Sequence, residues 1–205
     1  NELARALPPN DAVRSARLDA YRCITFLHGP DAALARAETG LAGQPAQREP
    51  LVRMEYLMCK AYALYNKGNR SEYTVALNEV LRLAKPERHP RLRSGALYLR
   101  SFHERDQGRY AQALTTLQEQ LELERKREAP NVALRAEVMI AGTYIELGLD
   151  ERAIVVLRAI EKDARAAGQP APLDMVLDKL GQAEEQAGRL DAALANYRES
   201  AELDR

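Results

Sequence analysis

Several features are scarce in this sequence of 205 residues, and each scarcity excludes a class of protein. There is no tryptophan, and there are only two phenylalanines. No apolar run reaches the roughly 18 residues that a membrane-spanning helix requires, so we predict no direct membrane insertion within this chain. Strand-length runs of β-branched and aromatic residues are also rare, which argues against a β-sheet. Because the chain begins at Asn1 rather than at a methionine, we interpret it as processed or excised from a longer protein.

An excess of one charge is missing as well. Thirty basic and thirty acidic side chains cancel. A protein that binds nucleic acid by neutralising phosphates needs a basic excess, so we predict no nucleic-acid partner. The most basic stretch, around His89, lies at a predicted helix start and is interpreted as solvated. The charge run 124–128 and the pair Glu184-Glu185 are likewise expected to be solvated helix residues.

Catalytic and metal-binding motifs are absent from the sequence. His28, His89 and His103 are scattered, and none is paired with a second ligand four residues away, as a helical zinc site requires. The glycines occur singly along the chain, so phosphate-binding and nucleophile-elbow motifs are missing. We therefore predict a protein that is not an enzyme and that has no cofactor and no metal.

Two cysteines, Cys23 and Cys59, lie in apolar stretches with helical spacing. Their separation fits neither a zinc motif nor a C-x-x-C redox pair. Two interpretations stay open. The cysteines are either buried small hydrophobic residues or the two halves of a disulfide between adjacent repeats.

What the sequence does contain is a repeating period of about 40 residues, a length typical of stacked structural repeats, built from strong helix formers. Residues of one type recur at this spacing in three columns. The prolines of the period are Pro50, Pro90, Pro130 and Pro170. The glycines are Gly68, Gly108, Gly148 and Gly188. The alanines are Ala33, Ala113, Ala153 and Ala193, each followed by leucine or isoleucine.

Each column has a physical role. Proline is tolerated at the start of a helix, and glycine adopts the left-handed conformation that ends one. The small alanine allows the second helix of a repeat to approach the first closely, and Asp31, Asp150 and Asp191 are expected to cap these second helices. The first helices are predicted at 11–28, 49–67, 89–107, 130–147 and 171–187. The second helices are predicted at 31–42, 71–84, 111–127, 151–167 and 191–204.

The predicted fold is therefore all-α. It is a single α-solenoid domain over residues 1–205, with five helix-turn-helix repeats. The repeat boundaries are at about 9–48, 49–88, 89–128, 129–168 and 169–205.

The residues of the period resemble the tetratricopeptide repeat (TPR). The resemblance is carried by Gly188-Arg189-Leu190 with Ala193-Leu194, and by the matching residues of the third and fourth repeats. His28 and Tyr73 depart from the pattern, and the period is longer than the usual TPR period of about 34. The resemblance implies a right-handed superhelix of about ten antiparallel helices. Long-period repeats of this kind are similar to sensor regions that precede diguanylate cyclase or histidine kinase modules in bacterial signalling proteins.

The resemblance also implies a concave groove, lined by the first helices, that holds a protein or peptide. We expect aromatic side chains to grip its apolar parts, with Arg22 and Arg105 binding its carboxylates. A packing role for individual aromatic residues is the alternative. The predicted groove residues are Arg22, Phe26, Tyr62, Tyr65, Asn66, Tyr98, Phe102, Arg105 and Arg135.

The predicted function is a non-catalytic protein- or peptide-binding scaffold, the sensory or regulatory domain of a larger bacterial signalling protein. One alternative is an architectural module that forms a homodimer through its terminal repeat, where Leu194, Tyr197 and Leu203 would be capped by a partner chain or by residues beyond Arg205. Another alternative is the TPR part of a peptide-sensing transcriptional regulator. An enzyme that uses the groove is a further alternative. The compartment would be periplasmic for a membrane-anchored sensor and cytoplasmic otherwise.

Overall fold

The computed structural model describes residues 11–24, 29–167 and 170–203, and within these ranges every regular element is a helix. The chain divides into two compact units, Asn1–Leu99 and Arg100–Arg205. The division lies within α7 (Pro90–Asp106). Each unit is described by itself, and the single domain over 1–205 stays a prediction.

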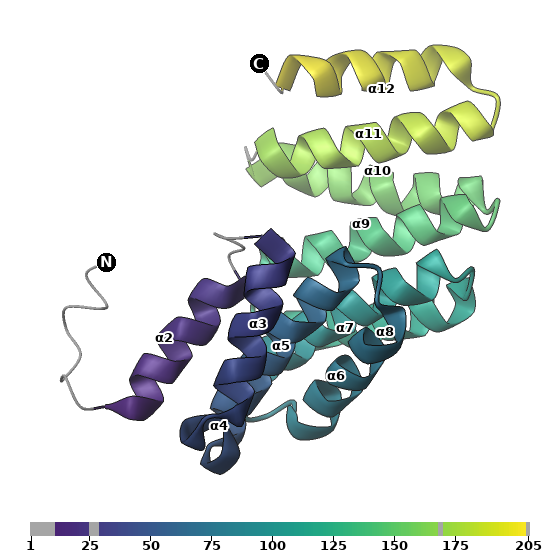
Figure 1. Cartoon of the computed structure of the whole chain (residues 1–205). Coiled ribbons are helices and arrows are strands. Elements are labelled where there is room, and N and C mark those ends of the chain that lie inside the picture. Colours follow the sequence, from purple (N-terminus) through teal and green to yellow (C-terminus); the bar gives the residue numbers. More distant parts are fainter. Residues whose placement is uncertain (1–10, 25–28, 168–169, 204–205) are drawn as a thin grey trace. The chain divides into compact units, whose positions relative to one another are not determined.

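The first unit is organised around α5, which packs against α2, α3, α4 and α6 (Figure 1). Its complete helices are α2 (Ala12–Ile24), α3 (Gly29–Ala42), α4 (Gln44–Arg48), α5 (Pro50–Asn66) and α6 (Arg70–Leu83). The core of this unit contains Met54, Leu57, Leu64 and Leu77, all buried.

The second unit stacks its helices in chain order. In Figure 1, α9, α10, α11 and α12 follow one another as successive layers, and α9 also packs against α8. Its complete helices are α8 (Tyr110–Lys126), α9 (Pro130–Glu146), α10 (Asp150–Ala167), α11 (Pro170–Gln186) and α12 (Leu190–Leu203). One hydrophobic cluster runs through α9, α10 and α11 and includes Ile154, Leu157, Leu177 and Leu180.

The prolines and glycines of the period lie at the predicted helix boundaries. Helices α5, α7, α9 and α11 each begin at the proline of the period and are 17 residues long. The following glycines have positive φ angles, +67° at Gly148 among them. There, Leu149 N donates to Tyr144 O (2.8 Å) and Gly148 N donates to Ile145 O (3.0 Å). These two bonds form a Schellman motif, which satisfies carbonyls at the end of α9. The ends predicted for the first helices of the second to fifth repeats are therefore confirmed to within one residue. The end predicted at residue 28 lies outside the residues that the structure describes.

Replacing Gly148 by alanine is expected to destabilise the protein by about 1–2 kcal/mol, because an L-residue is strained in the left-handed conformation. A Cβ at this position would meet no heavy atom within 4 Å, so backbone strain is the main cause. Urea unfolding measures the change. The control is Gly95→Ala inside α7, where the nearest atom to the added Cβ is the flexible end of Met58 at 3.2 Å. An equal loss in both variants would contradict the explanation.

Two details of the helix starts differ from the prediction. The five-residue helix α4 lies between the two helices of adjacent repeats and was not predicted, because Gly43 and Pro45 are typical of a loop. The three aspartates expected as caps lie inside the first turns of α3, α10 and α12. There their negative charge is stabilised by the positive end of the helix dipole.

Side chains do cap two other helices. At the start of α6, Asn69 Oδ1 accepts from Glu72 N (3.3 Å). At the start of α2, Asp11 Oδ1 accepts from Arg14 N (2.9 Å). Both bonds satisfy an amide that has no partner within its helix.

Tyr73, which replaces the alanine of the period in α6, is fully buried. Its ring lies 5.6 Å from the ring of Tyr65, and its hydroxyl donates to the backbone oxygen of Leu99 on α7. At the same position of the other second helices, Ala33, Ala113, Ala153 and Ala193 are buried. The second repeat therefore fills with an aromatic ring the place where the other repeats have a methyl group.

Three glutamates are buried among the described residues, two of them in stretches that were expected to be solvated. Glu124, in the charge run, is fully buried and accepts from Arg127 Nη1 at 2.6 and 2.7 Å. Glu184 is buried between helices, which corrects the expectation of a solvated pair; its Oε1 accepts from Arg158 Nη2 on α10 (2.5 Å). Glu104 is buried as well, and it accepts from Thr116 Oγ1 (2.7 Å). A buried carboxylate requires such partners, because an unpaired charge in the interior is costly.

The buried polar pairs occur in alternate repeats. Glu104 and Thr116 join α7 to α8, and two periods later Asn196 Nδ2 donates to Glu184 (3.4 Å) and joins α12 to α11. The repeat between them has Tyr144 and Val156 at the corresponding positions, and both pack against the hydrophobic cluster. The second repeat has Leu64 and Ala76 there. At this pair of positions the residues are thus apolar, polar, apolar and polar from the second to the fifth repeat.

Cys23 on α2 and Cys59 on α5 form a disulfide, which decides between the two interpretations of the cysteines. Both residues are buried in a small cluster with Ala33, Ala37 and Ala63. Two polar contacts join the same helices, Arg17 to Glu55 (2.9 Å) and the Tyr56 hydroxyl to Asp19 Oδ2 (2.9 Å). The bridge is the covalent member of a row of contacts that attaches the first repeat to the second.

Candidate functional site

The predicted groove residues lie on first helices and belong to both units. Tyr62, Tyr65, Asn66 and Tyr98 lie in the first unit, on α5 and α7, and we name them the tyrosine surface. Phe102, Arg105 and Arg135 lie in the second unit, on α7 and α9. The two sets are therefore considered separately.

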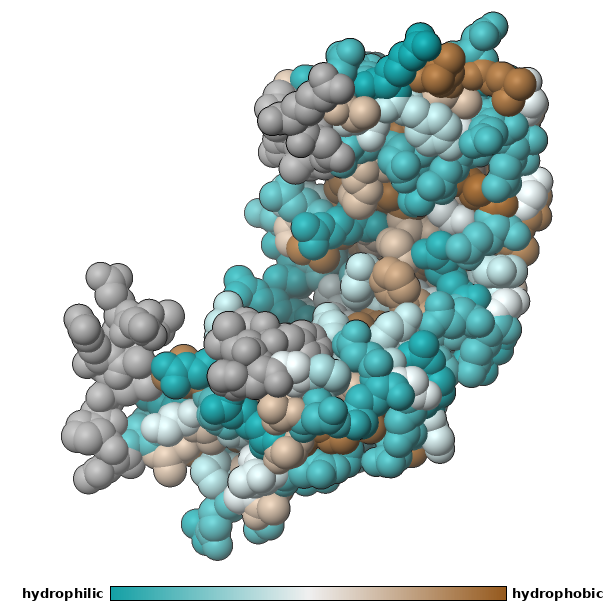
Figure 2. Space-filling view, turned by 45° about the horizontal axis from the view of Figure 1, so that its top comes forward, coloured by the Kyte–Doolittle hydropathy of each residue, from teal (hydrophilic) through white to brown (hydrophobic). Residues whose placement is uncertain are grey.

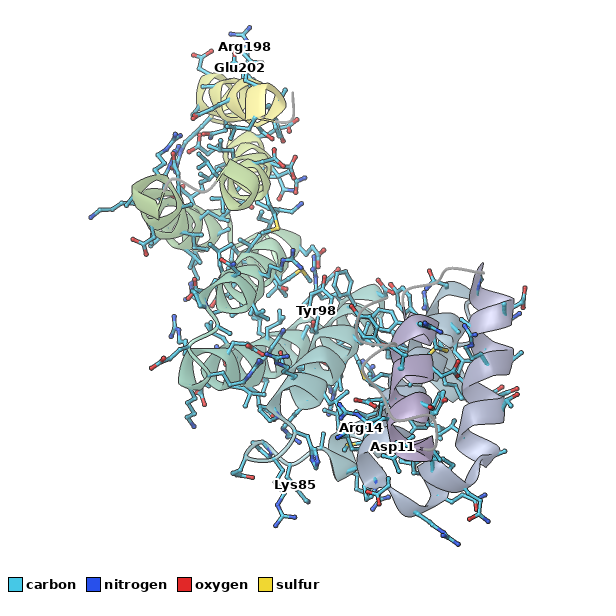
Figure 3. All side chains as sticks on the ribbon, turned by 90° about the vertical axis from the view of Figure 1, so that its left-hand side faces the viewer. Asp11, Arg14, Lys85, Tyr98, Arg198 and Glu202 are labelled. Carbon is cyan, nitrogen blue, oxygen red and sulfur yellow. A yellow bond between two sulfur atoms is a disulfide. The ribbon has the colours of Figure 1, made fainter. Side chains whose placement is uncertain are left out.

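Tyr62 and Tyr98 bring two phenol groups together from neighbouring first helices. Both are partly exposed and pack against the core cluster that includes Leu57 and Leu64. Burial raises the pKa of the Tyr62 phenol, and the nearby Tyr98 raises it further. A neutral phenol can donate its hydroxyl hydrogen to a carbonyl or carboxylate oxygen. Figure 3 labels Tyr98 among the side chains of this part of the chain.

Tyr65 is held in place from two sides. The guanidinium carbon of Arg70 lies 4.0 Å from the Tyr65 ring centroid, which is a cation–π distance, and Arg70 Nη1 donates to the Tyr65 backbone oxygen (3.0 Å). The buried ring of Tyr73 lies on another side. Asn66, which is exposed, donates from Nδ2 to Tyr62 O (2.8 Å). The ring of Tyr65 is therefore preorganised by its neighbours, which lowers the entropy cost of binding.

The two remaining predicted residues of the first unit belong to the first repeat. Arg22 is exposed near the end of α2, directly before the bridged Cys23. The disulfide thus fixes the helix end that carries this guanidinium. Phe26 lies outside the residues that the structure describes.

Arg105 in the second unit already has a carboxylate partner. Its Nε and Nη2 atoms donate to the two oxygens of Glu146 on α9, at 3.1 and 2.5 Å. The guanidinium lies 5.9 Å from the Phe102 ring centroid and crosses α9 at Gly142, where a Cβ would lie 3.6 Å from Nη2. Arg105 therefore joins two first helices, and a ligand carboxylate would have to compete with Glu146.

Arg135 is exposed on α9. It lies seven residues before Gly142, two turns along the helix from the position that Arg105 crosses. Unlike the guanidinium of Arg105, that of Arg135 is exposed to solvent. Pairing it with a charged group of a partner would therefore carry only a small desolvation cost.

The part of the chain that the structure describes was also searched for metal-binding groups and membrane-spanning helices. Residues 11–24, 29–167 and 170–203 contain no group of three histidine, cysteine, aspartate or glutamate side chains placed to hold a metal ion. Across the same ranges, no helix has the length and hydropathy needed to span a membrane.

Sequence reasoning missed the residues that support the site. Arg70 and Tyr73, which hold Tyr65, lie across a turn from it, and the period predicts no such contact. The Arg105–Glu146 pair could have been predicted from the sequence. Equivalent positions on neighbouring first helices are about one period apart, so opposite charges at that spacing indicate an ion pair. Opposite charges 41 residues apart on these helices meet here, as do Arg17 and Glu55 at 38 residues.

Comparison with known proteins finds likeness in structure but not in sequence. No protein-family model matches the chain, and no curated protein sequence matches it. A protein from Podosopora anserina, assigned as a kinesin light chain with nearly identical TPR-like repeats, superposes with a TM-score of 0.71. That likeness covers 94% of this chain and 94% of the other at 16% identity. A form of the same protein with a single substitution gives a TM-score of 0.73 over 99% and 96% of the two chains, also at 16% identity.

The chain has a TPR-like repeat fold. The resemblance noted in the sequence is thereby confirmed at the level of fold, as are the all-α class and the helical repeats. At 16% identity, the likeness does not extend to what is bound. In this TPR-like fold the tyrosine surface and the Arg105–Glu146 pair lie on the first helices of their repeats, while Val75 and Val155 are exposed on second helices.

Proposed function

We propose that the chain is a non-catalytic protein-binding scaffold whose tyrosine surface holds a peptide segment of a partner. The observation that carries the proposal is the set of partly exposed tyrosines on α5 and α7. Aromatic side chains in ordered settings are the usual anchors of protein interfaces. The Tyr62 and Tyr98 hydroxyls would donate to peptide carbonyls while their rings cover apolar side chains. Arg22 supplies a positive charge for an acidic residue of the same peptide.

We also propose the wider context of a sensory or regulatory domain in a bacterial signalling protein. The support is the resemblance of the long-period repeats to such sensor regions. Identification of the neighbouring segments of the natural protein tests this. A diguanylate cyclase or histidine kinase module would support it, whereas a DNA-binding module would favour the peptide-sensing regulator.

Selection from a displayed random-peptide library tests the binding proposal. Peptides selected on the wild-type protein are measured by isothermal titration against a Tyr62→Ala/Tyr98→Ala variant. We expect binding to weaken at least about tenfold, the effect of losing roughly 1.4 kcal/mol from an interface anchor. A Tyr62→Phe/Tyr98→Phe variant keeps the rings and reports on the hydroxyls alone.

The matched control is Val75→Ala, which removes an exposed apolar side chain from α6 of the same unit. This variant is expected to bind like wild type. Circular dichroism shows whether each variant remains folded. Failure to select any peptide, or equal affinity of selected peptides for wild type and the double alanine variant, would contradict the proposal.

A further inference from the structure

The outer side of α12 is an exposed helix face that mixes apolar and charged residues. Leu190 is 66% exposed and Leu194 is 46% exposed. Hydrophobic surface is visible over this helix in Figure 2. Figure 3 shows Arg198 and Glu202 extending from α12 on the side away from α11. These four residues are spaced by four, so they form one stripe along the helix.

Tyr197 does not belong to this face. The sequence suggested that a partner would cap it, but its ring packs on α11, where a Cβ on Gly181 would lie 2.4 Å from Tyr197 Cε1. Its hydroxyl donates to Glu185 (2.9 Å). Burial and this carboxylate together raise the pKa of Tyr197 to about 12. Tyr197 thus packs and hydrogen-bonds within the fifth repeat. The stripe that includes Leu194 and Arg198 faces outward.

Two residues of this stripe, Leu194 and Arg198, have covered counterparts one period earlier on α10. Ile154 lies one period before Leu194 and is only 7% exposed, in the cluster that joins α10 to α11. Arg158 lies one period before Arg198, and it donates to the buried Glu184 of α11 (2.5 Å). The covering helix α11 therefore meets this stripe with apolar residues and one carboxylate.

The residues of α11 define what such a covering helix needs. Leu173, Leu177 and Leu180 are buried in the cluster with Ile154, and Glu184 follows at the end of the same row. The spacing is i, i+4, i+7 and i+11, which is one face of an amphipathic helix. The carboxylate comes last, where it reaches the arginine of the stripe.

From this we propose that the outer face of α12 is a docking site for an amphipathic helix of another protein with the pattern of α11. Its apolar residues would cover Leu190 and Leu194, and its glutamate would pair with Arg198. The argument is complementarity, because Arg198 repeats the arginine that binds Glu184 inside the protein. The site is independent of the proposed peptide binding at the tyrosine surface.

A second copy of this chain that docks through α2 fits the site less well. The helix α2 exposes Val13 and Tyr21, but its single acidic residue, Asp19, is already bound by Arg36 (3.1 Å) and by the Tyr56 hydroxyl. A copy docking through α2 would therefore bring no free carboxylate to Arg198. We therefore take the occupant to be a helix of a different protein; a second copy docking through α12, whose stripe carries Glu202, is the alternative that the light-scattering measurement below separates from it.

A synthetic peptide with the sequence of residues 170–187 is the probe, because it carries the covering pattern. Fluorescence anisotropy with the labelled peptide is expected to show saturable binding to the wild-type protein. Leu194→Asp should abolish binding, and Arg198→Glu should weaken it at least about tenfold. A peptide in which the residue at the Glu184 position is arginine should regain affinity for the Arg198→Glu protein.

The matched control is Arg152→Glu, which reverses an exposed arginine on α10 and should leave peptide binding unchanged. Light scattering over a range of protein concentrations accompanies the titration. No binding up to about 1 mM peptide, or no loss in Arg198→Glu, would overturn the proposal. A concentration-dependent dimer that Leu194→Asp abolishes would also overturn it, in favour of self-association through the terminal repeat.

Discussion

Removing the Cys23–Cys59 bridge by a Cys23→Ala/Cys59→Ala substitution is expected to lower the free energy of unfolding by about 4 kcal/mol. The bridge joins residues 36 positions apart, and closing a loop of that length restricts the unfolded chain by about this amount. Native packing offers little to replace it. The cluster around the bridge consists of alanines, with Leu34 at its edge, and small side chains bury little apolar surface.

Urea unfolding with and without a dithiol reductant measures this effect. The oxidised wild type should unfold at a clearly higher urea concentration than the reduced wild type. The reductant should not change the unfolding midpoint of the double alanine variant, which has no bridge. This variant is the control for any effect of the reductant other than cleavage of the disulfide. Alkylation of the unfolded, unreduced wild type should detect no free thiol, because both cysteines are bridged. Identical unfolding midpoints with and without reductant would show that the bridge contributes nothing.

Replacing Tyr73 by alanine is the second change for which we expect a large effect, about 3–5 kcal/mol of lost stability. The substitution restores the residue that the period shows at this position, so sequence comparison alone would predict a neutral or stabilising change. The structure predicts the opposite, because the side chain is fully buried and its ring packs near Tyr65. Truncation would leave a cavity beneath the tyrosine surface.

Tyr73→Phe separates packing from hydrogen bonding. It keeps the ring and removes only the hydroxyl that donates to Leu99 O, so it should cost about 1 kcal/mol. Thermal unfolding followed by circular dichroism measures both variants. Because the Tyr65 ring packs near the Tyr73 ring, the Tyr73→Ala variant should also bind peptides selected on the tyrosine surface more weakly. A stability equal to that of wild type in Tyr73→Ala would show that the second repeat can close around a small side chain.

The helix boundaries could be predicted because single residues determine them. Pro50 and its counterparts lack an amide hydrogen and begin helices, and Gly68 and its counterparts have the positive φ that ends them. These are local effects, so they can be seen in the sequence. The resemblance to the tetratricopeptide repeat, with the glycines of the period as anchors, then led us to predict the candidate site on the first helices.

The partners of buried and site residues could not be predicted in the same way. Glu124, Glu104 and Glu184 lie in charged surroundings along the chain, and only the packing of neighbouring helices shows that they are buried. Arg105 looked like a ligand for an acidic peptide, but Glu146 of the next first helix binds it. Such pairings depend on the rotation of each helix about its axis. A difference of one residue in that rotation, about 100°, decides between groove, core and solvent.

Because buried polar pairs occur in alternate repeats, the pattern of the array recurs every two repeats and not every one. Deleting the third or the fourth repeat alone would preserve the period of prolines and glycines, yet it would bring together two repeats that are both apolar or both polar at these positions. Deleting two adjacent repeats would preserve the order in which Glu104–Thr116 and Glu184–Asn196 alternate with apolar neighbours. We therefore expect lengthened or shortened forms of this protein to be tolerated best when repeats are gained or lost in pairs, as though the gene had grown by duplicating a two-repeat block at each step.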